Sequence, residues 1–237
     1  MPPVILITRP APECAATADV LGRLTGLRVI QSPLLAIRAM GALPDMTEVE
    51  TLIFTSRNAV RRYAALNGPN LPAICVGTAT AAVAREMGHQ TRTMGGDAAA
   101  LIKDVIADPP VGPMLHIRGE VAQCEIARHL TAAGLPTDEV VVYAQDFLDL
   151  SKGATAALVG QAPVIVPLYS PRTARRFALL CPKDAPVHIV SISRSTQDAL
   201  NLANEGFNAI STSISATPDA AAMIQAITAT LQRLEGR

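Results

Sequence analysis

The residues Asp97-Ala98-Ala99-Ala100-Leu101-Ile102 recur in the second half of the chain as Asp219-Ala220-Ala221-Ala222-Met223-Ile224. In both copies the aspartate stands where a helix needs an N-cap residue. The segments 56–63 and 170–177 show a similar relation, because each begins with serine, follows an apolar run and opens a helical stretch. The shared order and spacing of these pairs indicate duplication of one α/β unit, which predicts two similar domains.

Short apolar runs rich in β-branched residues alternate with alanine-rich helical stretches along the chain. This alternation predicts an α/β protein whose parallel sheets are covered by helices on both faces, as in flavodoxin-like and Rossmann-like folds. Hydrophobic residues make up 49% of the sequence, enough for two apolar cores. The predicted strands are 4–8, 28–30, 52–55, 73–76, 114–117, 140–143, 164–169, 188–192 and 209–212.

The length of 237 residues also favours two domains, because single domains commonly have about 100 to 150 residues. The repeats do not decide how the copies pair, so a simple division into an amino-terminal and a carboxyl-terminal half stays open. The predicted hinges are residues 38–50 and 145–153, where the apolar periodicity lapses.

Composition and missing motifs exclude several classes of function. The formal net charge is zero and the basic residues are scattered, which argues against nucleic-acid binding and against a polybasic membrane patch. The four cysteines lie far apart, so no metal site or redox pair is encoded locally.

No apolar run reaches the roughly 20 residues of a membrane span, and we expect a cytoplasmic protein. Nucleotide-binding, dinucleotide-binding, hydrolase and zinc-protease motifs are all missing from the sequence.

Hydroxyl side chains, arginines and glycines follow the predicted strands in both repeats. In an open parallel sheet these positions meet at one edge, beside the amino termini of helices, where ligands bind. Guanidinium groups, hydroxyls and helix amides suit a ligand with several carboxylates. The alternative is that the hydroxyls are ordinary helix caps and the arginines merely solvated. The candidate binding residues are Arg9, Thr55, Ser56, Arg57, Gly77, Thr78, Thr80, Arg118, Gly119, Ser170, Arg172, Arg194 and Thr196.

A series of short motifs along nearly the whole chain is similar to the uroporphyrinogen-III synthase family. Each motif is weak alone, whereas their order and spacing together are fairly specific. The motifs are Ile7-Thr8-Arg9-Pro10, Ile53-Phe54-Thr55-Ser56, Val76-Gly77-Thr78-Ala79-Thr80-Ala81, Gly96-Asp97, Ile117-Arg118-Gly119, Val142-Tyr143, Tyr169-Ser170-Pro171 and Ser195-Thr196.

The resemblance implies how the repeats are arranged. In this family the first strand and helix pack into the domain formed by the carboxyl-terminal half. The resemblance therefore implies one domain of residues 1–35 plus 149–237 and a second of residues 36–148. It also implies a two-stranded connector between them, built from residues 29–37 and 140–146.

The same resemblance implies a lyase of haem biosynthesis that closes hydroxymethylbilane to uroporphyrinogen III with inversion of the terminal pyrrole ring. In the mechanism drawn for the family, loss of the terminal hydroxyl gives an azafulvene, and a spiro intermediate then fragments and recloses. Tyr143 matches the family tyrosine that assists loss of this hydroxyl. A phenol with an ordinary pKa of about 10 is protonated at neutral pH and can donate that proton. Because the bilane also closes spontaneously, to the uninverted isomer, we expect catalysis by positioning, without metal or cofactor.

Further expectations follow from the resemblance and from one position at which this sequence differs from the family. We expect a monomer whose substrate comes by transient contact with the preceding enzyme of the pathway. Ser193 stands where the family often has glycine, which could restrict approach of the substrate to the backbone. The alternative functions are a two-lobed sensor that binds a small anion without chemistry, and a degenerate synthase that only binds tetrapyrroles.

Overall fold

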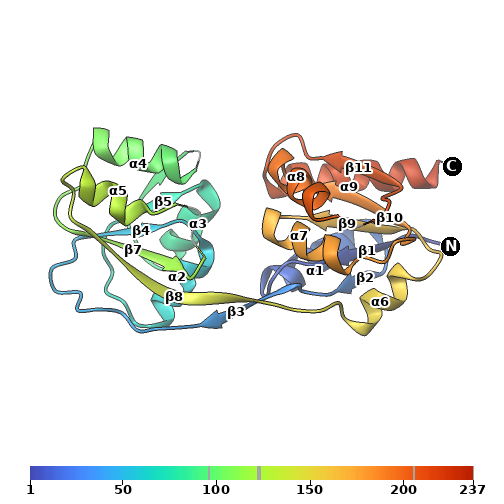
Figure 1. The fold of residues 1–237 in the computed structure, drawn as a ribbon, viewed down its shortest axis with the longest axis horizontal. Coiled ribbons are helices and arrows are strands. Elements are labelled where there is room, and N and C mark those ends of the chain that lie inside the picture. Colours follow the sequence, from blue (N-terminus) through green and yellow to red (C-terminus); the bar gives the residue numbers. More distant parts are fainter. Residues whose placement is uncertain (96, 122–123, 205, 237) are drawn as a thin grey trace. The chain divides into compact units, whose positions relative to one another are not determined.

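The computed structural model describes residues 1–95, 97–121, 124–204 and 206–236, so Gly96 of the Gly96-Asp97 motif lies outside the described residues. Contacts between Cα atoms divide the chain into two compact units (Figure 1). Unit 1 comprises Met1–Ala36 and Asp146–Arg237, and unit 2 comprises Ile37–Gln145. The first strand and helix therefore belong to the same unit as the carboxyl-terminal third of the chain.

The sheet of unit 1 is parallel between every described pair of neighbours, as the alternation of apolar runs and helices predicted. The first strand of the chain lies inside this sheet, where Ile5 is in register with Val29 on one side and with Ile165 on the other. The strands lie in the order β11 (Ser211–Ile214), β10 (Val187–Ser191), β9 (Val164–Leu168), β1 (Val4–Ile7) and β2 (Val29–Gln31).

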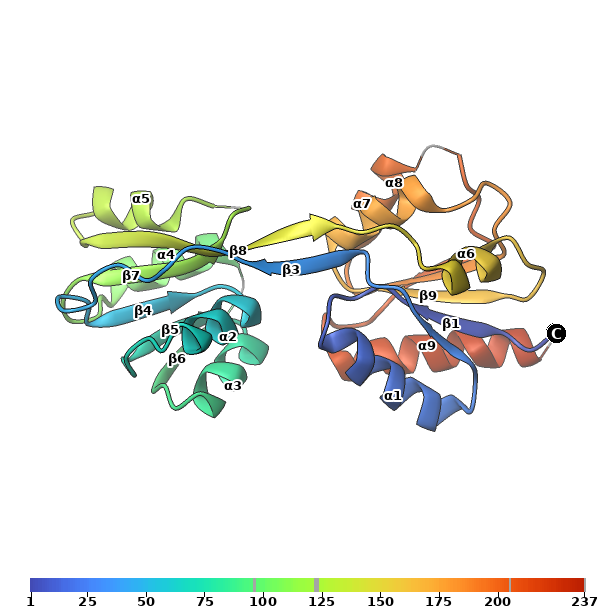
Figure 2. The same ribbon diagram turned by 90° about the horizontal axis from the view of Figure 1, so that it is seen from below.

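Helices cover both faces of this sheet (Figure 2). Alternate residues of β9 face opposite cores: Ile165 packs with α1 (Glu13–Thr25) and α9 (Ala220–Glu235), whereas Val166 packs on the other side. Side chains of opposite faces are both apolar because the strand is covered on both sides. The helices of the second face are α6 (Lys152–Leu158), α7 (Pro171–Leu180) and α8 (Arg194–Ala203).

The sheet of unit 2 has the same design with one added edge strand. Its strands lie in the order β3 (Leu35–Ala39), β8 (Thr137–Phe147), β7 (Met114–Gly119), β4 (Thr51–Phe54), β5 (Ala73–Val76) and β6 (Thr91–Met94). The pairs from β8 to β6 are parallel. The two sheets confirm the predicted α/β class.

Two pairs of helices cover the sheet of unit 2. The helices α2 (Arg57–Ala65) and α3 (Thr78–Glu86) pack on one face, and α4 (Ala98–Ala107) and α5 (Ile126–Ala132) pack on the other (Figure 2). Among the described residues, no helix is both long and apolar enough to cross a membrane.

The repeated alanine-rich segments form corresponding helices, and their aspartates cap them. Asp97 accepts hydrogen bonds from the amides of Ala99 and Ala100, both at 3.0 Å, at the start of α4. Asp219 accepts one from the amide of Ala222 at 2.9 Å at the start of α9. The N-cap prediction is therefore confirmed in both copies.

The sequence did not predict β6 as a strand. The resemblance placed residues 35–37 in the connector, and residues 38 and 39 fell in a predicted hinge. β6 reads Thr91-Arg92-Thr93-Met94 at the edge of its sheet, and only Met94 is buried, so it lacks an apolar run. β3 is hydrogen-bonded to β8, with Met40 N donating to Val142 O at 2.9 Å and Leu148 N to Leu34 O at 3.0 Å. Residue numbers rise along one strand as they fall along the other, so this pair is antiparallel.

Candidate active site

Most of the predicted site residues of unit 2 gather at the edge of the sheet where its parallel strands end, here called the carboxyl edge. Because β4, β5 and β7 run in the same direction, the residues that follow them meet at this edge. Thr55 and Ser56 follow β4, Gly77 and Thr78 follow β5, and Gly119 ends β7.

A bulge in β8 aims Tyr143 at this group. Arg118 is in register with Val141 and Gly119 with Tyr143, so Val142 is an extra residue on β8. As a result Val142 and Tyr143, although consecutive, both pack into the core on the α2 side of the sheet. Bulges commonly redirect a side chain next to an active site.

The hydroxyl of Tyr143 meets the hydroxyl of Ser56. Tyr143 Oη donates to Ser56 Oγ at 3.0 Å, and Ser56 Oγ also accepts from the amide of Asn58 at 3.1 Å as the N-cap of α2. A hydroxyl oxygen accepts two hydrogen bonds and still donates its own proton. Tyr143 is 7% exposed, and the serine that its hydroxyl contacts starts α2 at the carboxyl edge.

Gly77 starts α3 in a backbone conformation that requires glycine. Its φ is +77°, a region that other L-residues rarely adopt, and no heavy atom lies within 4 Å of the position of an added Cβ. Among the described residues, no side chain caps α3. Thr78 is exposed beside these first-turn amides, whereas Thr80 is buried in the helix.

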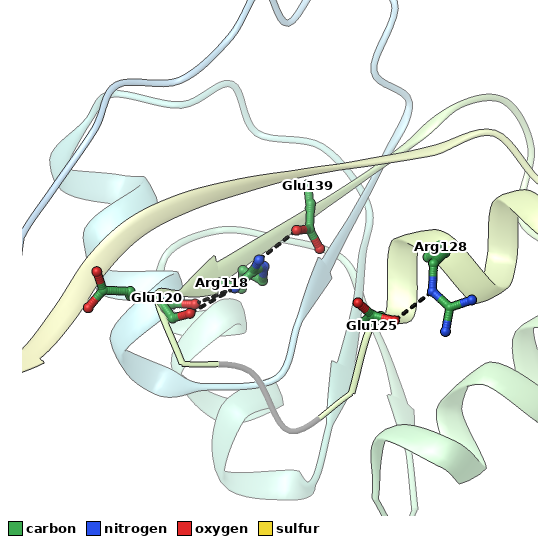
Figure 3. Close-up of polar contacts among 6 residues, drawn as sticks. Arg118, Glu120, Glu125, Arg128 and Glu139 are labelled. Carbon is green, nitrogen blue, oxygen red and sulfur yellow. Dashed lines mark hydrogen bonds and ion pairs between the residues drawn. The ribbon is translucent and has the colours of Figure 1, made fainter.

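Arg118 lies on the α5 side of the sheet, whereas Tyr143 packs on the α2 side. The guanidinium of Arg118 is already bound by neighbouring groups (Figure 3). Its Nη2 is 2.6 Å from Glu139 Oε1, and its Nη1 donates to the carbonyl oxygens of Gly119 at 2.9 Å and Glu120 at 3.1 Å. It faces a groove of about 620 Å³ beside α5, which the ion pair of Glu125 and Arg128 also lines. The structure therefore separates Arg118 from the other predicted residues of unit 2.

In unit 1 an arginine is held at the carboxyl edge by an aromatic ring. The guanidinium of Arg9, after β1, lies 4.2 Å from the ring centroid of Tyr169, which follows the neighbouring strand β9. Arg9 Nη1 also donates to Thr17 Oγ1 of α1 at 3.1 Å. Burial raises the pKa of Tyr169, which keeps the phenol neutral beside the cation. The sequence analysis named Tyr169 only as part of a motif and missed its contact with Arg9.

The other predicted residues of unit 1 open α7 and α8. Ser170 caps α7 by accepting from the amide of Thr173 at 3.2 Å, and the guanidinium of Arg172 lies 4.8 Å from the ring centroid of Phe147. Arg194 is exposed at the start of α8. Thr196 is fully buried, and its amide donates to Ser193 Oγ at 3.3 Å.

Ser193 therefore caps α8, which gives this departure from the family motif a local role. Among the candidate binding residues, Ser56 and Ser170 are also helix caps. Within the described ranges, no group of three or more His, Cys, Asp and Glu side chains is arranged to hold a metal ion.

Solved structures of two uroporphyrinogen-III synthases resemble this chain over its whole length. The uroporphyrinogen-III synthetase of Helicobacter pylori has a TM-score of 0.68 with 18% identity, and all of both chains is covered. A mutant uroporphyrinogen III synthase of the extremely thermophilic bacterium Thermus thermophilus has a TM-score of 0.57 with 14% identity, again with full coverage. At these identities the likeness shows the shared fold. No curated protein matches the chain.

A match to a protein-family model shows which family the chain belongs to, in addition to its fold. The model described as uroporphyrinogen-III synthase HemD matches residues 16–225, which include Ser56, Gly119 and Tyr143. This match favours the enzyme over the sensor that binds without chemistry. The chain belongs to the uroporphyrinogen-III synthase family.

Proposed function

We propose that this chain converts hydroxymethylbilane into uroporphyrinogen III and water, with inversion of the terminal pyrrole ring. The family match over residues 16–225 is the observation that carries the proposal. The hydrogen bond between Tyr143 and Ser56 supports it, because Ser56 follows β4 at the carboxyl edge, where ligands of parallel sheets bind.

In the proposed first step the bond between the hydroxymethyl carbon and its oxygen breaks. Tyr143 donates a proton to the departing hydroxyl, which leaves as water. The adjoining pyrrole nitrogen gives up its proton, which returns through solvent to the Tyr143 phenolate, and the azafulvene remains. When Tyr143 turns its proton toward the substrate, the Ser56 hydroxyl can donate to the phenol oxygen in return. The phenolate that forms is thus stabilised until it recovers a proton.

Closure at the substituted position, fragmentation and reclosure then invert the ring. These steps need the chain of pyrroles to be held in one pose, and an enzyme can supply much of its rate through such positioning. We propose that carboxylates of the substrate bind to side chains and first-turn amides at the strand ends. The residues proposed for this role are Arg9, Thr55, Ser56, Arg57, Gly77, Thr78, Ser170, Arg172 and Arg194.

We propose supporting roles for the remaining candidates. Thr80 and Thr196 are buried in helices, and Arg118 is bound to Glu139, so each stabilises the elements that carry the site. Gly119 lies beside the Tyr143 ring.

The deciding experiment generates hydroxymethylbilane in situ and separates the uroporphyrinogen isomers after oxidation. We expect isomer III in the presence of the protein and isomer I in its absence. Isomer I alone with folded protein present would contradict the proposed function.

We also propose that the protein acts in the cytoplasm as a monomer and receives the bilane through transient contact with the enzyme that makes it. Because the free bilane closes spontaneously, a short transfer time favours the inverted product. Light scattering should give a mass near 24.8 kDa for the isolated protein. Excess inactive supplier enzyme, added as a competitor, should raise the share of isomer I.

A further inference from the structure

Gly119 lies directly against the ring of Tyr143. A Cβ atom added to Gly119 would be 2.6 Å from Tyr143 Cζ, 2.7 Å from Cε2 and 2.9 Å from Oη. Non-bonded carbon atoms prefer separations of about 3.5 to 4.0 Å. The tyrosine ring therefore occupies space that any side chain at position 119 would need.

The requirement for glycine here is space, not backbone conformation. Gly77 has a positive φ and open surroundings, whereas Gly119 is the last residue of β7 and is absent from the positive-φ glycines of the described chain. Glycine in a strand often marks the close approach of another group. At Gly119 that group is the phenol of Tyr143.

The backbone of β8 and two neighbouring residues position the phenol. The bulge at Val142 turns the ring toward α2, Gly119 provides the surface on which the ring lies, and Ser56 accepts the hydroxyl hydrogen bond at 3.0 Å. Relief of a contact at 2.6 Å requires the ring to move by roughly 1 Å. A movement of that size would lengthen or break the bond to Ser56, because such bonds are rarely longer than about 3 Å.

We propose that Gly119 is a positioning residue, which sets the place of the Tyr143 hydroxyl and does not itself contact the substrate. This inference rests on the proposed function, because it takes Tyr143 as the proton donor. A substitution at Gly119 is expected to change turnover only by moving the hydroxyl of Tyr143.

The test is a double-mutant cycle on kcat with G119A, Y143F and the double variant. We expect G119A to lower kcat at least about tenfold with little change in KM, because a misplacement of about 1 Å can cost up to about a hundredfold. In the Y143F background, where no hydroxyl remains to be placed, the same substitution should change kcat less than about twofold. Equal losses in both backgrounds would overturn the proposal.

Gly68 offers a matched control, because an added Cβ there would also meet a tyrosine ring, that of Tyr63, which belongs to the same unit and is outside the site. We expect G68A to lower the melting temperature without changing kcat per folded molecule or the ratio of isomers. A loss of kcat in G68A equal to that in G119A would show that any packing defect in this unit has the same effect, which overturns the proposal.

A stability measurement covers the case in which G119A does not fold. The double variant G119A/Y143L removes the atoms of the ring that the new methyl group meets, so it should melt at a higher temperature than G119A. Absence of this rescue would overturn the assigned contact. Production of isomer I alone by the wild type would instead reject the proposed function while leaving the rescue measurable, so the two failures are distinguishable.

Discussion

Tyr143 donates a 3.0 Å hydrogen bond to Ser56, although 87 positions separate the two residues in the sequence. The same serine oxygen accepts the amide of Asn58, so one hydroxyl joins the tyrosine of β8 to the first turn of α2. Loss of either side chain should therefore affect turnover more than stability.

Replacement of Tyr143 by phenylalanine should lower kcat at least about tenfold, because general-acid catalysis typically contributes about a hundredfold or more. Stability should fall by only about 1 kcal/mol, the usual net value of one hydrogen bond. Steady-state kinetics and thermal denaturation measure the two effects. Tyr63→Phe is the control: Tyr63 Oη donates to Pro69 O at 2.8 Å, and its loss should leave kcat unchanged. Wild-type turnover by Tyr143→Phe would remove this tyrosine from the mechanism.

Replacement of Ser56 by alanine should lower both kcat and stability. The stability loss should be about 1 kcal/mol, because α2 loses its N-cap. The control Ser151→Ala removes the cap of α6, where Ser151 accepts from the amide of Ala154 at 3.3 Å, and should cost stability alone. Equal kcat values for the two variants would mean that Ser56 acts only as a cap.

Replacement of Arg9 by lysine should raise KM for the bilane by about tenfold with a smaller change in kcat. Lysine keeps the charge but lacks the planar group that lies over Tyr169, so it is held less firmly for a carboxylate. Single-turnover measurements over a range of bilane concentration would show the change. An unchanged KM would argue that Arg9 only packs against Tyr169 and α1.

Replacement of Arg118 by alanine should show the opposite pattern. Its side chain is 18% exposed and bound to Glu139, Gly119 and Glu120, so its loss should cost about 1 to 2 kcal/mol of stability. KM should stay within about twofold of the wild-type value, since Arg118 lies on the α5 side of the sheet. A tenfold rise in KM at unchanged stability would place Arg118 in substrate binding instead.

His116 should make the stability of the protein depend on pH. It is 1% exposed in β7, its ring nitrogens have no hydrogen-bond partner among the described residues, and burial lowers its pKa to about 4. Between pH 6.5 and about 4 the unfolded chain binds a proton that the folded chain does not, so this residue reduces stability by roughly 3 kcal/mol as the pH falls through that window.

His116→Leu should remove this dependence. It should also stabilise the protein by about 1 to 3 kcal/mol at pH 7.5, because an unpartnered polar group is replaced by an apolar one. Urea denaturation of both proteins at pH 7.5 and pH 5 gives the comparison. A difference between wild type and variant that is the same at both pH values would contradict the lowered pKa.

Local sequence patterns predicted much of the fold, because strand patterns and helix caps depend on residues that are close together in the chain. The runs that became β4, β9 and β10 are apolar on both faces because helices cover both sides of their sheets. Asp97 and Asp219 could be recognised as caps because capping involves only the next three residues. β6 was missed because an edge strand with one buried side chain has no such pattern.

The candidate site was predictable as a set of positions and not as a set of contacts. Parallel strands bring their ends to one edge, so Ser56, Gly77 and Gly119 could be grouped from the order of strands and helices alone. Whether a side chain after a strand faces that edge depends on the register of the neighbouring strand. The bulge at Val142 changes that register for Tyr143, whereas Arg118 of β7, which is paired with Val141 ahead of the bulge, faces α5.

The sequence by itself determined the duplicated α/β unit, the caps of its helices and the strand ends that carry hydroxyls and arginines, because each depends on residues close together in the chain. The tertiary structure alone decided which of these residues act together. Tyr143 meets Ser56 and lies on Gly119, and Arg9 lies over Tyr169, because strands distant in sequence are neighbours in a sheet. Those contacts are set by strand order and register, which no local pattern encodes.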